Sequence, residues 1–242
     1  FSLGTSFEQK QNFFLSPSLT LEHEKLETSR SASSKLKAQE GTYFDLNFNY
    51  GILYDLRNQS YATTDGFYSK FSQVVPVVSN SWSLLNTYDF KTYHQLSEQM
   101  ISSVSFYIKA INSLGGDDVV VSDRVYLPSK RLRGFKKGRI GPKDNQEFIG
   151  GNYASAVSLS TTLPNFLSEL QFIDFNLFFD VGNVWGVDYD KSIDKSKIRS
   201  STGLGVNMST VIGPINFTFA QPITKDSGDT TESFRFDIGT TF

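Results

Sequence analysis

Long runs of alternating apolar and polar side chains constrain the fold of this chain more than any other feature. In the segment FIDFNLFFDVGNVW, residues 172–185, one face carries Ile173, Phe175, Leu177, Phe179 and Val181. The opposite face carries Asp174, Asn176, Phe178, Asp180 and Gly182. Successive side chains of a β-strand point to opposite faces, so this period of two predicts a strand with one apolar and one polar face.

The same alternation recurs along most of the chain. We expect strands at 13–25, 42–55, 66–77, 82–96, 101–111, 172–185, 197–210, 215–221 and 233–242, and a strand cut short at 1–8. The pattern is least regular at 66–77 and 82–96. For the whole chain we expect about eleven strands, the ten segments above among them. Most would be about 9–12 residues long, which is longer than in soluble sheets and long enough for a tilted strand to cross a bilayer.

Two folds can use such strands. A soluble β-sandwich turns one face of each strand toward a core, and it is the default for any single strand. Here the polar faces hold small and hydrogen-bonding residues along their full length, while the apolar faces are aromatic and aliphatic. Only 38% of the chain is hydrophobic, although 14% is aromatic. We therefore predict an all-β fold, a transmembrane antiparallel β-barrel.

Composition excludes several other classes. Cysteine is absent, so disulfides and thiolate metal sites are excluded. The net charge of −2 gives no general attraction to nucleic acid. No run of 18 apolar residues could cross a membrane as a helix. The first residues, FSLGTSFEQ, start as though inside a strand, so we expect this chain to be a piece of a longer protein.

One segment breaks the charge balance. Residues 124–143 contain eight Lys or Arg and no acidic residue, and they include the sequence KRLRGFKKGRIGPK. On charge alone, such a block is typical of a solvated or nucleic-acid-binding segment. It lies, however, within a loop of about forty residues, 112–151, and loops of this length are usually functional or disordered.

An ordered series of motifs resembles the family of the outer membrane protein assembly factor BamA. The matching segments are LRGF (132–135), IGP (140–142), GGNYASAVSLS (150–160), FFDVGNVW (178–185), IRSSTGLGVNM (198–208), GPINFTFAQP (213–222) and FRFDIGTTF (234–242). The resemblance is strong from about residue 120 to the end and weaker over 42–119. A lone RGF is a weak signal, whereas the whole series is specific.

The resemblance implies that the RGF-bearing loop folds back into the barrel lumen. Arg133, Gly134 and Phe135 would then form a latch, with Asp180 as the carboxylate partner of Arg133. By the alternation above, Asp180 lies on the polar, inward face, and a bidentate carboxylate is the best acceptor for an enclosed guanidinium. The family commonly has a second acid where this chain has Ser160, so we include Ser160 and Arg199 as candidates for a wider latch network.

The resemblance also implies a function. The family folds and inserts other β-barrels into the bacterial outer membrane through a seam between its first and last strands, without a cofactor. One lip of that seam would be the C-terminal strand, with Phe234, Phe236, Ile238, Gly239 and Phe242. The implied partners are unfolded outer-membrane protein clients, accessory assembly lipoproteins and the lipid bilayer, with no nucleic acid. We expect residues 1–242 to be the C-terminal part of a barrel of about sixteen strands, without the family's POTRA domains.

Alternatives from other classes stay open at this point. One is a related outer-membrane translocator of the TamA or two-partner secretion type, which shares the RGF loop. Another is a passive channel lined by Lys109, Arg199 and Arg235. An outer-membrane hydrolase using His94 with Ser97 and Glu98 is disfavoured, because neighbours in a strand point to opposite faces. Both His23 and His94 are read as solvated or interfacial residues. Asp188, Asp190 and Asp194 lack the glycine and final Glu of a calcium loop.

Overall fold

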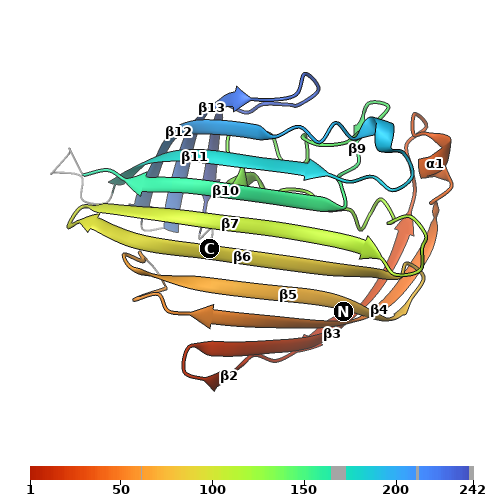
Figure 1. The fold of residues 1–242 in the computed structure, drawn as a ribbon, viewed down its shortest axis with the longest axis horizontal. Coiled ribbons are helices and arrows are strands. Elements are labelled where there is room, and N and C mark those ends of the chain that lie inside the picture. The colour runs from red at the N-terminus through yellow and green to blue at the C-terminus, as the bar shows by residue number, and fades with distance from the viewer. Residues whose placement is uncertain (61, 165–172, 211–212, 240–242) are drawn as a thin grey trace.

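A single long antiparallel sheet makes up most of the molecule (Figure 1). The structure is a computed structural model and describes residues 1–60, 62–164, 173–210 and 213–239. The pairing order β1-β3-β4-β5-β6-β7-β10-β11-β12-β13-β14 follows the chain, and β2 also pairs with β3. The strands are β1 (Ser2–Gly4), β2 (Phe7–Lys10), β3 (Phe13–Leu26), β4 (Gly41–Asp55), β5 (Gly66–Ser79), β6 (Ser83–Ser97), β7 (Met100–Ser113), β10 (Tyr153–Thr162), β11 (Ile173–Trp185), β12 (Arg199–Thr210), β13 (Gly213–Thr224) and β14 (Phe234–Ile238). The all-β antiparallel prediction is confirmed.

The N-terminal edge differs from the single strand expected at 1–8. β1 and β2 lie in succession along the same edge of β3, so they form one interrupted strand that reaches Lys10. The backbone N–H of Thr5, between them, still donates to the Pro17 carbonyl at 3.1 Å. Asn12, at φ 65°, then turns the chain into β3. Counted this way, the sheet has about the expected eleven strands.

The strands β3 to β7 are 14 or 15 residues long, more than the length of about 9–12 residues expected for most strands. β3 shows the reason for the extra length. Its last residues include Glu22, Glu24 and Lys25, which lie opposite the first residues of β4. Charged side chains of this kind belong in water. These strands therefore extend past their apolar segments.

The two faces of the sheet differ in chemistry as the alternation predicts. On β10 and β11, Leu159 lies opposite Phe179, and they are 48% and 40% exposed, whereas Asp180 is fully buried on the other face. Other large apolar side chains exposed on these strands and their neighbours are Val104, Phe106, Val157, Leu177, Phe219, Phe234, Phe236 and Ile238. A contiguous exposed apolar band is what a barrel presents to lipid.

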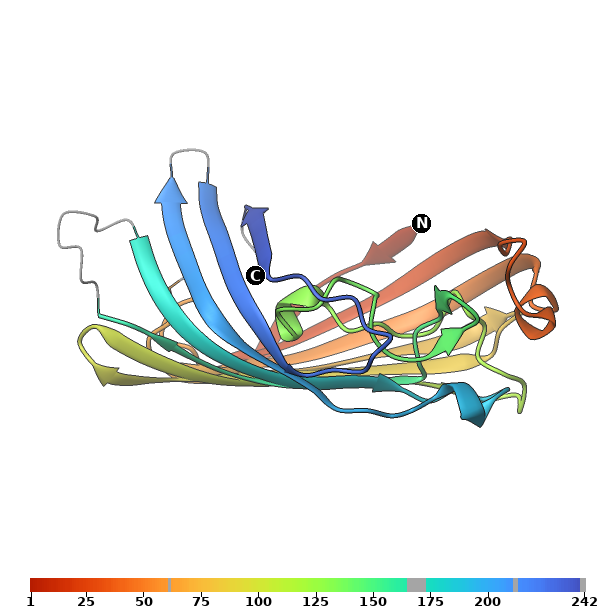
Figure 2. The same ribbon diagram turned by 90° about the horizontal axis from the view of Figure 1, so that it is seen from above.

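The long loop lies on the concave side of the curved sheet (Figure 2). It contains η1 (Ser129–Arg131) and a small two-stranded sheet of β8 (Lys143–Asp144) and β9 (Glu147–Phe148). The main buried cluster joins loop residues to the inner faces of the strands. Its members are Tyr107, Ile111, Val119, Val125, Leu127, Leu132, Phe135, Ile140, Ala154, Ala156 and Val184. The core of the molecule is therefore made between the loop and the concave face.

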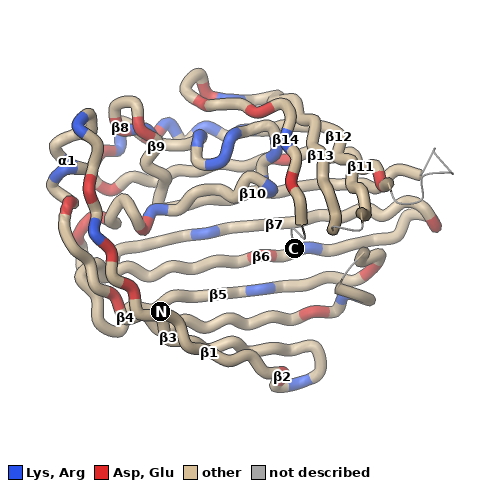
Figure 3. Tube along the Cα trace, turned by 180° about the vertical axis from the view of Figure 1, so that it is seen from behind, with Lys and Arg blue, Asp and Glu red and all other residues tan. Residues whose placement is uncertain are grey.

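Charged residues gather mainly in the connections rather than along the strands (Figure 3). Many lie near α1 (Ser34–Lys37), β8 and β9. These elements belong to a group of connections that pack on one another, with Ala32, Leu36, Ile149 and Val187 forming a second small apolar cluster. Within the described residues, no helix is long and apolar enough to cross a membrane.

Candidate functional site

The backbone of the RGF segment brings Arg133 against the sheet. After η1, Leu132 has φ −147° and ψ 83°, and it is almost fully buried. Gly134 follows at φ 89°, a left-handed conformation that favours glycine. A β-carbon at Gly134 would come within 3.2 Å of the Ala220 β-carbon and 3.3 Å of that of Ser201. Glycine therefore permits both the turn and the close approach to β12 and β13.

Arg133 and Asp180 form a two-pronged ion pair. Arg133 Nε donates to Asp180 Oδ2 at 2.7 Å, and Nη2 donates to Oδ1 at 2.7 Å. The backbone N–H of Arg133 donates to Oδ2 at 3.0 Å. The Asp180 side chain is 0% exposed and that of Arg133 is 16% exposed. A buried carboxylate is tolerated when its oxygens are satisfied in this way.

The residues around the pair come from one row across neighbouring strands. The register places Ser158 of β10 and Ser201 of β12 on either side of Asp180 of β11. Arg133 Nη2 donates to Ser158 Oγ at 3.0 Å, and Ser201 Oγ donates to the Arg133 carbonyl. The guanidinium carbon lies 3.5 Å from the centroid of the Phe178 ring, which faces the same side as Asp180. The loop is thus bound to three strands at one point.

Two members of the expected latch network are not at this pair. Ser160 lies opposite Phe178, one step further along the inner face, because the register gives the place beside Asp180 to Ser158. Arg199 lies opposite Gly182 and binds Asp229 instead. Neither residue is therefore a described partner of the Arg133–Asp180 pair, which the structure does bring together. Their place in a wider latch network stays a prediction.

Phe135 is 2% exposed and belongs to the main buried cluster. That cluster lies between the loop and the concave face of the sheet. Its backbone also forms an isolated antiparallel bridge with Thr231, in the connection between β13 and β14. The segment therefore has apolar as well as ionic attachment.

A second ion pair in the same segment was not predicted. Arg131 Nη2 binds Asp89 Oδ2 of β6, and the Arg131 guanidinium lies 5.1 Å from the Tyr107 ring centroid. The Tyr68 hydroxyl donates to the other oxygen of Asp89 at 3.3 Å. Arg131 and Arg133 thus fix the loop to different strands, β6 and β11. The sequence offers one sign of this pair, because Asp89 is an acidic residue on the inward face of the irregular segment 82–96.

The remaining cations of the basic block have varied surroundings. Lys136, Lys137 and Arg139 are exposed. Lys143 lies 4.1 Å from the Phe148 ring centroid. Arg124 is buried against Tyr189, and burial lowers the pKa of its guanidinium. A solvated or nucleic-acid-binding block therefore does not describe this segment, because its arginines largely bind the protein itself.

One loop carboxyl has a perturbed environment. Asp123 accepts a hydrogen bond from Ser81 Oγ at 3.1 Å. Burial raises the pKa of Asp123 to about 6, and the nearby carboxylates of Asp45, Glu24 and Glu22 act in the same direction. The charge of the Asp123 carboxyl therefore responds to mildly acidic pH.

The C-terminal strand has one described partner. β14 pairs with β13 from Ile215 opposite Ile238 to Phe219 opposite Phe234. The outward side chains of Phe234, Phe236 and Ile238 are each about half exposed or more, at 49%, 57% and 61%. Gly239 has φ 108°. Phe242 lies outside the described residues.

Several of the residues considered for other functions have structural partners instead. Arg235 pairs with Asp237 at 3.0 Å, and Arg199 with Asp229. His94, Ser97 and Glu98 are exposed at one end of β6. Asp188, Asp190 and Asp194 accept hydrogen bonds from backbone N–H groups. Among the described residues, no group of at least three His, Cys, Asp or Glu side chains could hold a metal ion.

A long-stranded sheet with an apolar outer face and a loop bound to its inner face defines a membrane β-barrel domain. The Omp85 superfamily domain matches residues 1–242, and the chain belongs to that superfamily. It is 30% identical over 139 residues to the outer membrane protein assembly factor BamA of Neisseria meningitidis serogroup B, covering 46% of this chain and 17% of that protein.

Similarity extends to eukaryotic proteins and to a solved structure. The human sorting and assembly machinery component 50 homolog is 25% identical over 219 residues, covering 83% of this chain and 46% of that protein. The crystal structure of BamA from Haemophilus ducreyi lacking POTRA domains 1–3 matches with a TM-score of 0.87 at 23% identity. That match covers 97% of this chain and 52% of the other. The chain thus spans about half or less of these relatives.

Proposed function

We propose that the protein containing this chain folds and inserts β-barrel proteins into an outer membrane through a lateral seam that includes β14. Membership of the Omp85 superfamily and similarity to BamA and to the component 50 homolog support an assembly factor. We propose that residues 1–242 are the C-terminal part of its barrel. No covalent chemistry is required of the chain.

The observation that carries this proposal is the short pairing of β14. Within the described residues, β14 makes five register pairs with β13, whereas β13 makes eleven with β12. In lipid, every backbone polar group needs a partner, so a client strand cannot enter with a bare edge. A weakly paired strand at the edge of the barrel can offer that partner temporarily.

The partners follow from this mechanism. They are unfolded outer-membrane protein clients, the lipid bilayer and accessory assembly lipoproteins. We place the protein in the bacterial outer membrane, supported by the similarity to BamA of Neisseria meningitidis. The BamA-like motifs around residues 140–152 favour this assignment over a translocator of the TamA type.

Arg133 and Asp180 have the role of a latch in this proposal. They hold the loop within the barrel, where it fills the concave side and supports the wall formed by β10, β11 and β12. A barrel occupied in this way is a poor passive channel, because the loop lies in the path of solutes. This separates the assembly function from the channel alternative.

The test uses the full-length protein in cells whose own copy can be switched off. We expect Arg133→Ala to lower the amount of folded client in the outer membrane several-fold when the variant and the wild type are present at equal levels. Lys137→Ala, which removes an exposed cation from the same segment, should have no effect. Normal client levels with Arg133→Ala would contradict the proposed role of the latch. A large, stable conductance of the wild-type protein in planar bilayers would favour the channel.

A further inference from the structure

The connection between β13 and β14, residues 225–233, lies directly against the RGF segment. Gly134 accepts a hydrogen bond from the Glu232 backbone N–H at 3.0 Å, and the Lys136 backbone N–H donates to the Thr230 carbonyl at 3.0 Å. These two bonds flank the bridge between Phe135 and Thr231. The latch segment and the chain that enters β14 therefore form a short antiparallel ladder.

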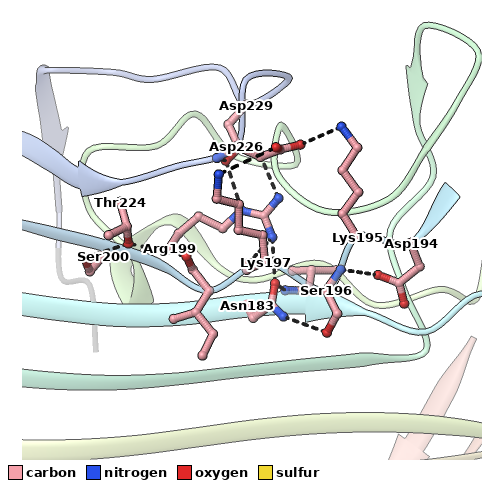
Figure 4. A network of polar contacts seen from close by, with 12 residues as sticks. Asn183, Asp194, Lys195, Ser196, Lys197, Arg199, Ser200, Thr224, Asp226 and Asp229 are labelled. Carbon is pink, nitrogen blue, oxygen red and sulfur yellow. Dashed lines mark hydrogen bonds and ion pairs between the residues drawn. The ribbon is translucent and has the colours of Figure 1, made fainter.

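A second buried ion pair fixes this connection to the sheet (Figure 4). Arg199 Nε and Nη2 donate to the two carboxylate oxygens of Asp229, each at 3.0 Å. The side chains are 3% and 1% exposed. Arg199 Nη1 also donates to Asn183 Oδ1 at 2.6 Å. The pair thus joins the connection to β12 and β11.

Asp229 also orders the connection itself. Its Oδ2 accepts from the Asp226 backbone N–H at 2.7 Å, and its own N–H donates to the Asp226 carbonyl at 3.1 Å. The next residue, Thr230, donates its N–H to the Arg139 carbonyl at 3.1 Å. One carboxylate therefore shapes the turn immediately before the ladder with the RGF segment begins.

The ladder is too short to be stable alone. An isolated pair of short strands is marginal in water, so the geometry of residues 230–232 depends on what holds their ends. The Arg199–Asp229 pair holds one end, and β14 follows the other. Leaving one member of such a pair buried without its partner is strongly unfavourable.

We infer that Arg199 and Asp229 are positioning residues that keep the β13–β14 connection paired with the RGF segment, so that the luminal loop and the seam strand move as one unit. The two arginine–aspartate pairs then have separate tasks. Arg133–Asp180 fixes the loop to the wall, and Arg199–Asp229 fixes the strand entry to the loop. The functional meaning of this coupling rests on the proposed seam, whereas the pairing itself does not.

The test traps the ladder with a disulfide in the full-length protein. The chain has no cysteine of its own. Lys136→Cys and Thr230→Cys place thiols on exposed, directly opposed residues of the ladder. The α-carbons of residues directly opposed across an antiparallel ladder are about 4.5–5.5 Å apart, within disulfide range. The readout is the rate of disulfide formation after addition of a mild oxidant, measured in membranes.

Asp229→Asn should slow disulfide formation about fivefold or more, because the connection then leaves the RGF segment for part of the time. Arg199→Lys keeps the charge but loses the two-pronged contact, so we expect an intermediate rate. The exchange Arg199→Asp with Asp229→Arg should restore much of the rate. The matched control is Lys195→Ala, which removes an exposed ion pair to Asp226 in the same connection and should leave the rate unchanged.

Wild-type rates of disulfide formation in the folded Asp229→Asn and Arg199→Lys variants would overturn the inference. If Asp229→Asn does not fold, Arg199→Lys and the charge exchange still decide. Client assembly is measured separately in the same variants. Altered disulfide rates with normal assembly would contradict the coupling to the seam, while the structural role of the pair would stand.

Discussion

At the scale of single residues, Asp180 shows what alternation can and cannot predict. Its inward face follows from the period of two, and the motif identifies Arg133 as its partner. Ser158 and Ser160 share that inward face, so alternation alone cannot choose between them. The choice depends on the register of β10 and β11, which is set by contacts along both strands.

The two serines therefore give a direct test of the register. Ser158→Ala removes a hydroxyl that contacts both members of the ion pair and should cost about 1 kcal/mol of unfolding free energy. Ser160→Ala should change stability by less than about 0.5 kcal/mol. Denaturant titration in detergent measures both. Equal effects of the two substitutions would contradict the observed register.

Asp123 predicts a dependence of stability on pH. Its pKa is raised to about 6 in the folded state from the ordinary value of 3.8, so the folded protein binds more protons between those values. Stability from this group is therefore highest at low pH and falls as pH rises through about 4 to 6, by an amount on the order of 3 kcal/mol.

The variant Asp123→Asn isolates this effect. It should unfold at a higher temperature than wild type at pH 7.5, and the difference should shrink or vanish at pH 4, where the wild-type carboxyl is protonated. Scanning calorimetry in detergent at the two pH values measures the difference. A variant that is equally destabilised at both pH values would contradict the expected environment of Asp123.

At the scale of elements, the sequence predicts the strands well and their attachments less well. Each expected strand from 13–25 onward overlaps an observed one in the described residues. The interruption between β1 and β2 leaves no mark in the pattern. The ion pairs of Arg131 and Arg199 join residues 42 and 30 positions apart, so local patterns cannot reveal them. Motif resemblance identifies Arg133 and Asp180 because it carries this long-range information.

The seam strand should be the least protected strand of the sheet's C-terminal half. β14 has five described register pairs on one side, whereas β11 is paired on both sides. We expect its backbone amides to exchange with deuterium at least tenfold faster than those of β11, because local opening needs less free energy. Mass spectrometry of the protein in nanodiscs measures this. Equal protection of the two strands would contradict a weak seam.

At the scale of the whole molecule, apolar side chains occupy two different places. The sheet exposes them on its outer face, whereas the loop buries them against the inner face, as in the core of a soluble protein. Large apolar side chains such as Leu159 and Phe179 cover the outer face, while Leu132 and Phe135 are buried between the loop and the inner face. The loop therefore does for the concave side what a second sheet does in a soluble sandwich. Its removal would leave a wall with polar groups and no packing partner.

The most direct test of this account is a double-mutant cycle on Arg133 and Asp180. The measurement is the temperature at which the barrel loses its compact gel mobility in detergent. Arg133→Ala and Asp180→Asn should each lower this temperature, because each removes about 3 kcal/mol of unfolding free energy. The double variant should lose much less unfolding free energy than the sum of the two single losses. Additive losses, or unchanged gel mobility in both single variants, would contradict a loop held inside the barrel by this pair.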